Sequence, residues 1–195
     1  MTVPLDLHFK GDRNYIHGTD FFESISKSCS AKMGGFLQRL AFKRLTRNQC
    51  DLVFDQTGTI ADSIARGTWK TGDGRPAHFL LVETERPVTK RYPYDEEPIR
   101  RLIRISNKEA SMPFLREYST IEAIVATTKF LNQRLNPPLE KAWLFGQIDL
   151  TCALPETWEY IQVKQFISSL GLFSRSKLFI HGVEIGEIRF IQGAT

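Results

Sequence analysis

The strongest constraint on the fold is an order of elements that occurs twice along the chain. Each half of the 195-residue sequence reads as a strand, a loop, one helix and then several antiparallel strands that end in a hairpin. Segment 15–28 is similar in pattern to segment 118–132, and segment 68–83 is similar to segment 173–191. A helix packed on one antiparallel sheet buries its apolar side in a single layer. The sequence therefore predicts two similar α+β halves.

The first half begins with apolar and polar residues that alternate over residues 4–10. This period predicts a half-buried strand whose polar face carries His8 and Lys10. A helix is expected to follow, capped by Thr19 and running to about residue 31, where Gly34 and the glycine after it end it. Further extended segments are predicted at residues 36–54, 59–70 and 77–85, with a turn at residues 70–75.

A segment rich in prolines and charged residues, residues 87–98, is predicted to link the halves. The N-terminal half would then cover residues 1–86 and the C-terminal half residues 99–195. In the second half, Ser119 and Glu122 have the spacing of a capping box at the start of a helix. The apolar face of this helix is predicted to carry Ile121, Ile124, Val125, Thr128 and Leu131, and Asn136 with the prolines after it would end the helix. The remaining segments are expected as strands at residues 99–106, 142–153, 158–167, 171–180 and 183–191, and as a loop at residues 107–117.

Charge and composition exclude several classes of function. The chain has 26 Lys and Arg residues against 22 Asp and Glu residues, and no dense basic stripe, so no nucleic-acid partner is expected. Two basic clusters are interleaved with apolar residues at strand-like spacing, which favours solvated strand faces. An alternative is a docking surface for an acidic carrier protein or a phosphate-bearing cofactor. The clusters are Arg39, Lys43, Arg44 and Arg47, and later Arg100, Arg101 and Arg104.

The three cysteines, Cys29, Cys50 and Cys152, fit neither a disulfide framework nor a zinc site by number and spacing. A reducing cytoplasmic location is therefore expected. No signal peptide and no membrane-spanning segment can be recognised, so no membrane partner is expected. His78 and His181 lack acidic residues at metal-ligand spacing, so no metal site and no cofactor are predicted.

One motif near the N-terminus carries candidate chemistry. His8, Phe9 and Gly11, followed by Gly18 and Glu23, resemble in their order a motif of the β-hydroxyacyl carrier-protein dehydratases. These enzymes belong to the hotdog superfamily, and the order of elements along this chain resembles two hotdog units in tandem. The resemblance implies a double hotdog, with two central helices that are each wrapped by a curved antiparallel sheet.

The resemblance also implies an activity, the dehydration of a 3-hydroxyacyl thioester. In that family a histidine removes the proton beside the thioester carbonyl, and a carboxyl group from the opposite member of the pair protonates the departing hydroxyl. The residues implied here are His8 and Glu122, and a mirror site with Glu23 would be inactive because Ser106 and Asn107 stand where its histidine would fall. A helix N-terminus could polarise the carbonyl group. The substrate contacts implied are Gly11, Gly18, Thr19, Tyr118 and Ser119.

Two other functions are open. His17, Thr19 and Asp20 resemble the helix start of hotdog thioesterases, in which Asp20 or Glu122 would act as base or nucleophile. The chain could also bind an acyl chain or partner without catalysis, because Arg13 and His17 replace loop prolines of the dehydratases and only one half carries the histidine. Asp20 and Glu122 have structural roles available as a dipole partner and a capping residue. The expected partner is acyl-CoA or an acyl carrier protein, and a homodimer is also compatible with the resemblance.

Overall fold

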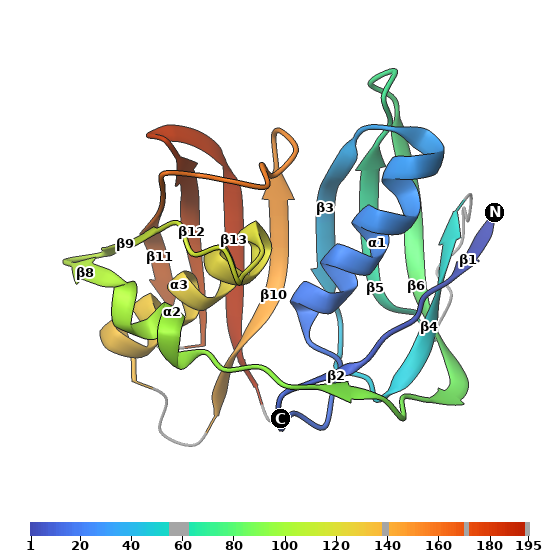
Figure 1. Ribbon diagram of the computed structural model, residues 1–195, viewed down its shortest axis with the longest axis horizontal. Coiled ribbons are helices and arrows are strands. Elements are labelled where there is room, and N and C mark those ends of the chain that lie inside the picture. Colours follow the sequence, from blue (N-terminus) through green and yellow to red (C-terminus); the bar gives the residue numbers. More distant parts are fainter. Residues whose placement is uncertain (55–62, 138–140, 170–171, 194–195) are drawn as a thin grey trace. The chain divides into compact units, whose positions relative to one another are not determined.

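The computed structural model describes residues 1–54, 63–137, 141–169 and 172–193. The chain divides into two compact units, Met1–Tyr94 and Asp95–Thr195. Each unit contains one long helix and an antiparallel sheet (Figure 1). None of the helices among the described residues is both long enough and apolar enough to cross a membrane.

The described residues of the first unit form an antiparallel sheet of five strands in the order β1-β4-β6-β5-β3. Helix α1 (Gly18–Met33) lies against one face of these strands (Figure 1) and buries Phe21, Phe22, Ile25 and Cys29. The strands are β1 (Thr2–Pro4), β3 (Phe36–Phe42), β4 (Asn48–Phe54), β5 (Ser63–Lys70) and β6 (Pro76–Pro87). The predicted strand at residues 59–70 starts before the described part of β5.

Helix α1 begins two residues earlier than predicted. Its N-cap residue is His17, not Thr19, because the His17 backbone is extended and its ring nitrogen accepts from the Thr19 amide. The predicted end of the helix is confirmed, since Gly34 is the C-cap residue with a φ of 59°. Trp69 on β5 donates its indole N–H to the Gly34 carbonyl over 2.7 Å, which fixes the helix end to the sheet.

The predicted strand over residues 4–10 is wrong in extent. The chain pairs as β1 only to Pro4, and then forms the two-residue strand β2 (Phe9–Lys10), which pairs in parallel with β7 (Arg91–Tyr92). Lys10 therefore does not lie on a solvated face, and its side chain is 0% exposed. Gly11 turns the chain after β2 with a φ of +56°, which favours glycine.

The second unit has the strand order β10-β13-β12-β11-β9-β8. Helix α3 (Thr120–Leu135) packs on this sheet (Figure 1), and its predicted apolar face is buried as expected. The strands are β8 (Arg104–Ser106), β9 (Glu109–Pro113), β10 (Ala142–Leu150), β11 (Tyr160–Ser169), β12 (Phe173–Ile180) and β13 (Val183–Gly193). The predicted hairpin turn between β12 and β13 at His181 and Gly182 is confirmed.

Two predictions in this unit are wrong. Residues 99–106 are not one strand, because the short helix α2 (Glu97–Leu102) precedes β8, and the predicted loop 107–117 contains β9. Pro98 occupies the first turn of α2, where its missing N–H costs nothing. Ile99 of α2 is buried, and Glu96 at the start of α2 forms an ion pair of 2.6 Å with Lys129 of α3. The described residues thus form three helices rather than the expected two.

The two units share their chain order but differ in strand order within the sheet. In the first unit the first strand after the helix, β3, pairs with the third strand, β5. In the second unit the first strand after the helix, β10, pairs with the fourth strand, β13. The similarity between the halves therefore extends to element type and sequence order but not to the placement of the last hairpin.

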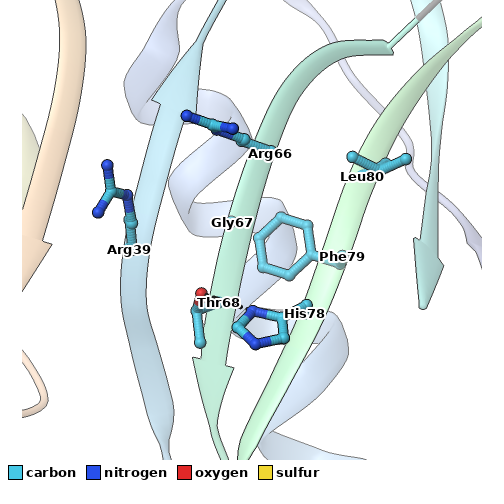
Figure 2. Close-up of a pocket in the computed structure, with 7 residues that line it drawn as sticks. All are labelled: Arg39, Arg66, Gly67, Thr68, His78, Phe79 and Leu80. Carbon is cyan, nitrogen blue, oxygen red and sulfur yellow. Dashed lines mark hydrogen bonds between the residues drawn. The ribbon is translucent and has the colours of Figure 1, made fainter. Parts of the chain in front are cut away.

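The sheet of the first unit also carries a pocket of about 370 Å³ (Figure 2). Its lining comes from β3, β5 and β6, and Gly67 lies at its centre. A Cβ atom at Gly67 would lie 2.2 Å from the Phe79 ring and 2.5 Å from the Arg39 carbonyl oxygen, so only glycine fits between them. The residues that line the pocket are Arg39, Arg66, Gly67, Thr68, His78, Phe79 and Leu80.

Candidate functional site

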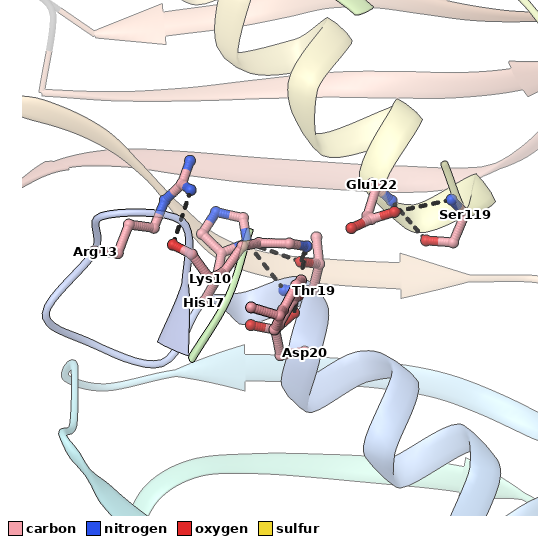
Figure 3. Close-up of polar contacts among 8 residues, drawn as sticks. Lys10, Arg13, His17, Thr19, Asp20, Ser119 and Glu122 are labelled. Atoms are coloured by element: carbon pink, nitrogen blue, oxygen red, sulfur yellow. Dashed lines mark hydrogen bonds and ion pairs between the residues drawn. The ribbon is translucent and has the colours of Figure 1, made fainter. Parts of the chain in front are cut away.

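A polar cluster surrounds the first turn of α1 (Figure 3). Lys10 Nζ donates to Thr19 Oγ1 over 2.8 Å and lies 3.3 Å from Asp20 Oδ1. Tyr92 of β7 donates its hydroxyl to the same Asp20 oxygen over 2.6 Å. The parallel pairing of β2 with β7 and the N-terminal turn of α1 therefore meet at one buried ion pair.

The environment of this ion pair is nearly free of solvent. The side chains of Lys10 and Asp20 are 0% and 8% exposed, and Lys10 Nζ lies 4.3 Å from the centre of the Tyr94 ring. Burial removes the hydration of both charges, which costs free energy, and the attraction between the ammonium group and the carboxylate offsets part of that cost. The positive end of α1 also favours Asp20 in its first turn. The second oxygen of Asp20, Oδ2, is buried and has no hydrogen-bond partner among the described residues.

The hydrogen bonds around Thr19 determine which nitrogen of His17 carries a proton. An ammonium group can only donate, so Thr19 Oγ1 accepts from Lys10 and must give its own hydrogen to another group. His17 Nδ1 lies 2.8 Å from that hydroxyl and also accepts from the Thr19 amide over 3.5 Å. Nδ1 is therefore an acceptor, and a neutral His17 carries its proton on Nε2. In this form His17 is suited to donate a hydrogen bond through Nε2.

His8 differs from His17 because its ring has no hydrogen bond among the described residues. Its Nε2 atom is buried without a hydrogen-bond partner and lies 3.4 Å from Asp6 Oδ1, while the side chain as a whole is 34% exposed. The segment before it is fixed by Gln49, whose side chain accepts from Leu7 N and donates to Leu7 O, both over 2.9 Å. His8 is thus an imidazole on a fixed backbone with one buried nitrogen unsatisfied.

The other predicted residues of the first unit surround the same helix end. Gly11 follows β2 and donates its amide to the Tyr92 carbonyl over 2.9 Å. Gly18 is the first residue of α1, so its amide has no acceptor within the helix. Glu23 lies about one turn further along α1 and is half-buried. The cluster thus contains Thr19, Asp20 and His17, and Gly18 begins the same helix.

The predicted residues of the second unit form the start of α3. Ser119 and Glu122 make the predicted capping box, in which Ser119 N donates to Glu122 Oε2 over 2.9 Å and Glu122 N donates to Ser119 Oγ over 3.3 Å (Figure 3). Tyr118 donates its hydroxyl to the Asp95 carbonyl over 2.6 Å. Burial, followed by the nearby carboxylates of Asp95 and Glu122, raises the pKa of Tyr118, so its phenol is protonated at neutral pH.

Removing the capping box should weaken α3 measurably. Ser119→Ala deletes the hydroxyl that accepts from the Glu122 amide and is expected to lower the free energy of unfolding by about 1 kcal/mol. Glu122→Gln keeps an acceptor for the Ser119 amide and should change it by less than about 0.5 kcal/mol. Urea denaturation of both variants measures this difference. Equal stability of Ser119→Ala and the wild type would contradict the capping role.

The described residues contain no group of three or more His, Cys, Asp or Glu side chains placed to hold a metal ion. The three cysteines are free thiols. Burial raises the pKa of Cys29 to about 11 and the pKa of Cys50 to about 12, so neither is an effective nucleophile at neutral pH.

Sequence patterns do not identify four residues at this site. The alternation over residues 4–10 predicts Lys10 on a polar strand face, and Tyr92 and Tyr94 fall in the expected linker. Gln49 lay in the long extended segment 36–54. The burial of Lys10 follows from the parallel pairing of two short strands about 80 residues apart, as the register of Phe9 with Arg91 shows. A lysine between the apolar Phe9 and a glycine turn was the one local signal available.

Comparison with known proteins gives structural matches only. No protein-family model matches the chain, and no curated protein sequence matches it. The bifunctional dehydratase-cyclase domain of ambruticin biosynthesis matches with a TM-score of 0.51 and 10% identity, over 92% of this chain and 83% of that chain. The pyran synthase domain from module nine of the sorangicin pathway matches with a TM-score of 0.47 and 14% identity, over 99% and 92% of the two chains. A candidate thioesterase from Novosphingobium aromaticivorans matches with a TM-score of 0.49 and 14% identity, over 100% and 94%.

Identities this low bear on the fold alone. The match to the dehydratase-cyclase domain covers most of both chains. The resemblance to hotdog-fold proteins that was inferred from the sequence is therefore confirmed at the level of the fold.

Proposed function

We propose that this protein acts on acyl thioesters as a dehydratase, with a 3-hydroxyacyl group carried by coenzyme A or by an acyl carrier protein as its substrate. The observation that carries the proposal is the imidazole of His8, which has a buried and unsatisfied Nε2 atom. Buried polar atoms nearly always have partners, so an exception calls for an explanation such as a catalytic role. The fold shared with a dehydratase-cyclase domain supports the same reaction class.

In the proposed reaction, His8 acts as the general base. It removes the proton from the carbon next to the thioester carbonyl, and the electron pair left behind forms the new carbon–carbon double bond as the hydroxyl on the next carbon departs. An acid gives that hydroxyl a proton, so that it leaves as water. The free amide of Gly18 and the positive end of α1 are suited to stabilise negative charge that develops on the carbonyl oxygen.

Two carboxyl groups are candidates for the acid. The Oδ1 atom of Asp20 accepts from the Tyr92 hydroxyl and lies 3.3 Å from Lys10 Nζ, so this oxygen is already engaged in contacts within the protein. Glu122 is half-buried at the start of α3, where its Oε2 atom accepts from the Ser119 amide. We propose Glu122 as the acid, because it is the residue implied by the resemblance.

Hydrolysis of an acyl thioester is the second candidate function, and one observation favours it. Asp20 Oδ2 is buried without a hydrogen-bond partner among the described residues. A carboxylate oxygen in this state could accept a proton from a water molecule and activate that water for attack on a thioester. This alternative assigns the essential role to Asp20 rather than to His8.

The architecture proposed for this function is a tandem of two hotdog-like units, residues 1–86 and 99–195, joined through residues 87–98. The long helices α1 and α3 would be the two central helices, and the short α2 an addition to the second unit. The three free thiols agree with a reducing cytoplasmic setting. Whether the protein forms a homodimer can be measured by light scattering during gel filtration.

Mass spectrometry of reaction products distinguishes the two functions. The protein is incubated with a 3-hydroxyacyl thioester and with the saturated acyl thioester of the same chain length. A dehydratase removes one water from the first and leaves the second unchanged, whereas a thioesterase releases the free acid from both. Glu122→Gln should lower the rate of dehydration by about 10²-fold or more while the protein stays folded. Hydrolysis of both substrates, unaffected by Glu122→Gln, would move the assignment to Asp20.

A further inference from the structure

The segment that carries His8 runs between two strands and belongs to neither. Strand β1 lies beside β4 (Figure 1), whereas β2 pairs with β7. The Leu5 amide still donates to the Cys50 carbonyl of β4 over 3.0 Å, and the Phe9 amide already donates to the Lys90 carbonyl over 2.9 Å. The main chain therefore passes from one partner to the other between these two contacts, and His8 lies within that passage.

A side chain of β4 takes the place of a neighbouring strand at this point. The Gln49 side chain accepts from Leu7 N and donates to Leu7 O, both over 2.9 Å. These are the two hydrogen bonds that a residue of an antiparallel strand exchanges with the residue opposite. Glutamine can imitate a backbone in this way because its amide carries an acceptor and donors together. Leu7 is thus held by both of its main-chain polar groups, although it lies in no strand.

The two peptide groups that flank His8 are both anchored as a result. The Leu7 carbonyl, bound by Gln49, belongs to the peptide group before His8, and the Phe9 amide belongs to the peptide group after it. Each peptide group is planar and rigid, so fixing one atom of each restricts the backbone rotations at His8. The position of the imidazole then depends on its own side-chain torsions and on these two anchors.

Gln49 is itself fixed by the sheet. The register of β4 with β6 shifts between Asn48 and Cys50, so Gln49 lies at a β-bulge. Thr84 of β6 donates its hydroxyl to the Gln49 carbonyl over 2.9 Å and ties the bulge to the next strand. Bulges change the direction of side chains and are common beside active sites. The bulge accounts for a half-buried glutamine that reaches the neighbouring segment.

We propose that Gln49 is a positioning residue that holds the His8 imidazole in place through the peptide group before it. This inference rests on the proposed function, in which His8 is the general base. Proton transfer depends closely on geometry, and a displacement of about 1 Å can lower a rate by about 10²-fold. Because Gln49 acts through His8 and not on the substrate, its loss should lower kcat and leave KM unchanged.

Two substitutions in the full chain test the proposal. Gln49→Met keeps the length of the side chain and removes both hydrogen bonds, and Gln49→Asn keeps the amide but is one methylene shorter. In both variants, hydrogen exchange of the Leu7 amide, followed by NMR, should be faster by about tenfold or more. The kcat for dehydration of a 3-hydroxyacyl thioester should fall by about tenfold to 10²-fold, with KM within about twofold of the wild type.

A matched control and a double variant separate positioning from a general effect on the fold. Gln38→Met is the control, because Gln38 is a half-buried glutamine of β3 whose side chain makes no hydrogen bond among the described residues. It should leave both the Leu7 exchange and kcat unchanged. In the His8→Ala background, Gln49→Met should cause no further loss of activity, since the group that it positions is already absent. Thermal unfolding checks that every variant is folded at the assay temperature.

Three results would overturn the role of Gln49: wild-type exchange at Leu7 in both variants, an unchanged kcat despite fast exchange, or an equal further loss of activity in the His8→Ala background. Failure of the proposed function looks different, because the wild type would then form no unsaturated thioester. The exchange of the Leu7 amide needs no substrate, so it would still decide whether Gln49 holds the segment that carries His8.

Discussion

His8→Ala is expected to lower the rate of dehydration of a 3-hydroxyacyl thioester by about 10²- to 10⁴-fold, the range contributed by a general base. The physical reason is the loss of the one imidazole near the N-terminal turn whose ring nitrogens are not used in hydrogen bonds among the described residues. His17 cannot replace it, because its Nδ1 atom accepts from Thr19. Rates are measured by the formation of the unsaturated thioester under single-turnover conditions.

Unfolding measurements on His8→Ala, and a control substitution at a second histidine, distinguish a catalytic role of His8 from a structural one. His8 makes no hydrogen bond that folding needs, and its contact with Asp6 involves a carboxylate that is 75% exposed, so the free energy of unfolding should change by less than about 1 kcal/mol. His181→Asn is the control, since asparagine tolerates the positive φ of 53° in that hairpin turn. Full activity of His8→Ala would remove the base from the proposal, whereas partial recovery with added imidazole would support it.

Local patterns predicted the second helix better than the first. The capping box of Ser119 and Glu122 and the apolar stripe of α3 depend on residues three or four positions apart, so the sequence is enough to locate them. The start of α1 depends on a histidine cap, which sequence preferences do not favour over Thr19. The helix itself was predicted correctly, and only its first residues were not.

Contacts between distant segments account for the other errors. The alternation of Lys10 with Leu5 and Leu7 predicts a single strand and therefore a solvated lysine. Its burial depends on Tyr92 and Tyr94, which are more than 80 positions away. Helix α2 was missed because Pro98 and its charged neighbours resemble a linker, and it is held by Ile99 and by the ion pair of Glu96 with Lys129. Neither arrangement has a local periodicity that could have revealed it.

The ion pair of Lys10 and Asp20 is the second place where a large effect is expected. Asp20→Asn removes the carboxylate that lies 3.3 Å from a fully buried ammonium group and should lower the free energy of unfolding by about 3–5 kcal/mol. Lys10→Met removes the ammonium group beside the buried Asp20 carboxylate and should lower the free energy of unfolding by a similar amount. The double variant removes both charges, keeps an oxygen for the Tyr92 hydroxyl, and is expected to be within about 1 kcal/mol of the wild type. Urea denaturation of all four proteins gives the coupling energy.

An exposed ion pair provides the comparison. Arg101 and Glu97 form an i,i+4 pair on α2 whose side chains are 76% and 48% exposed, and the same cycle there should give a coupling of about 0.5 kcal/mol or less. A coupling just as small for Lys10 and Asp20 would mean that water reaches the ammonium group. A large coupling has a consequence for function, because the double variant then offers a folded protein without the Asp20 carboxylate. Dehydration that persists in this variant, together with its loss in His8→Ala, would leave Asp20 a structural role at the start of α1.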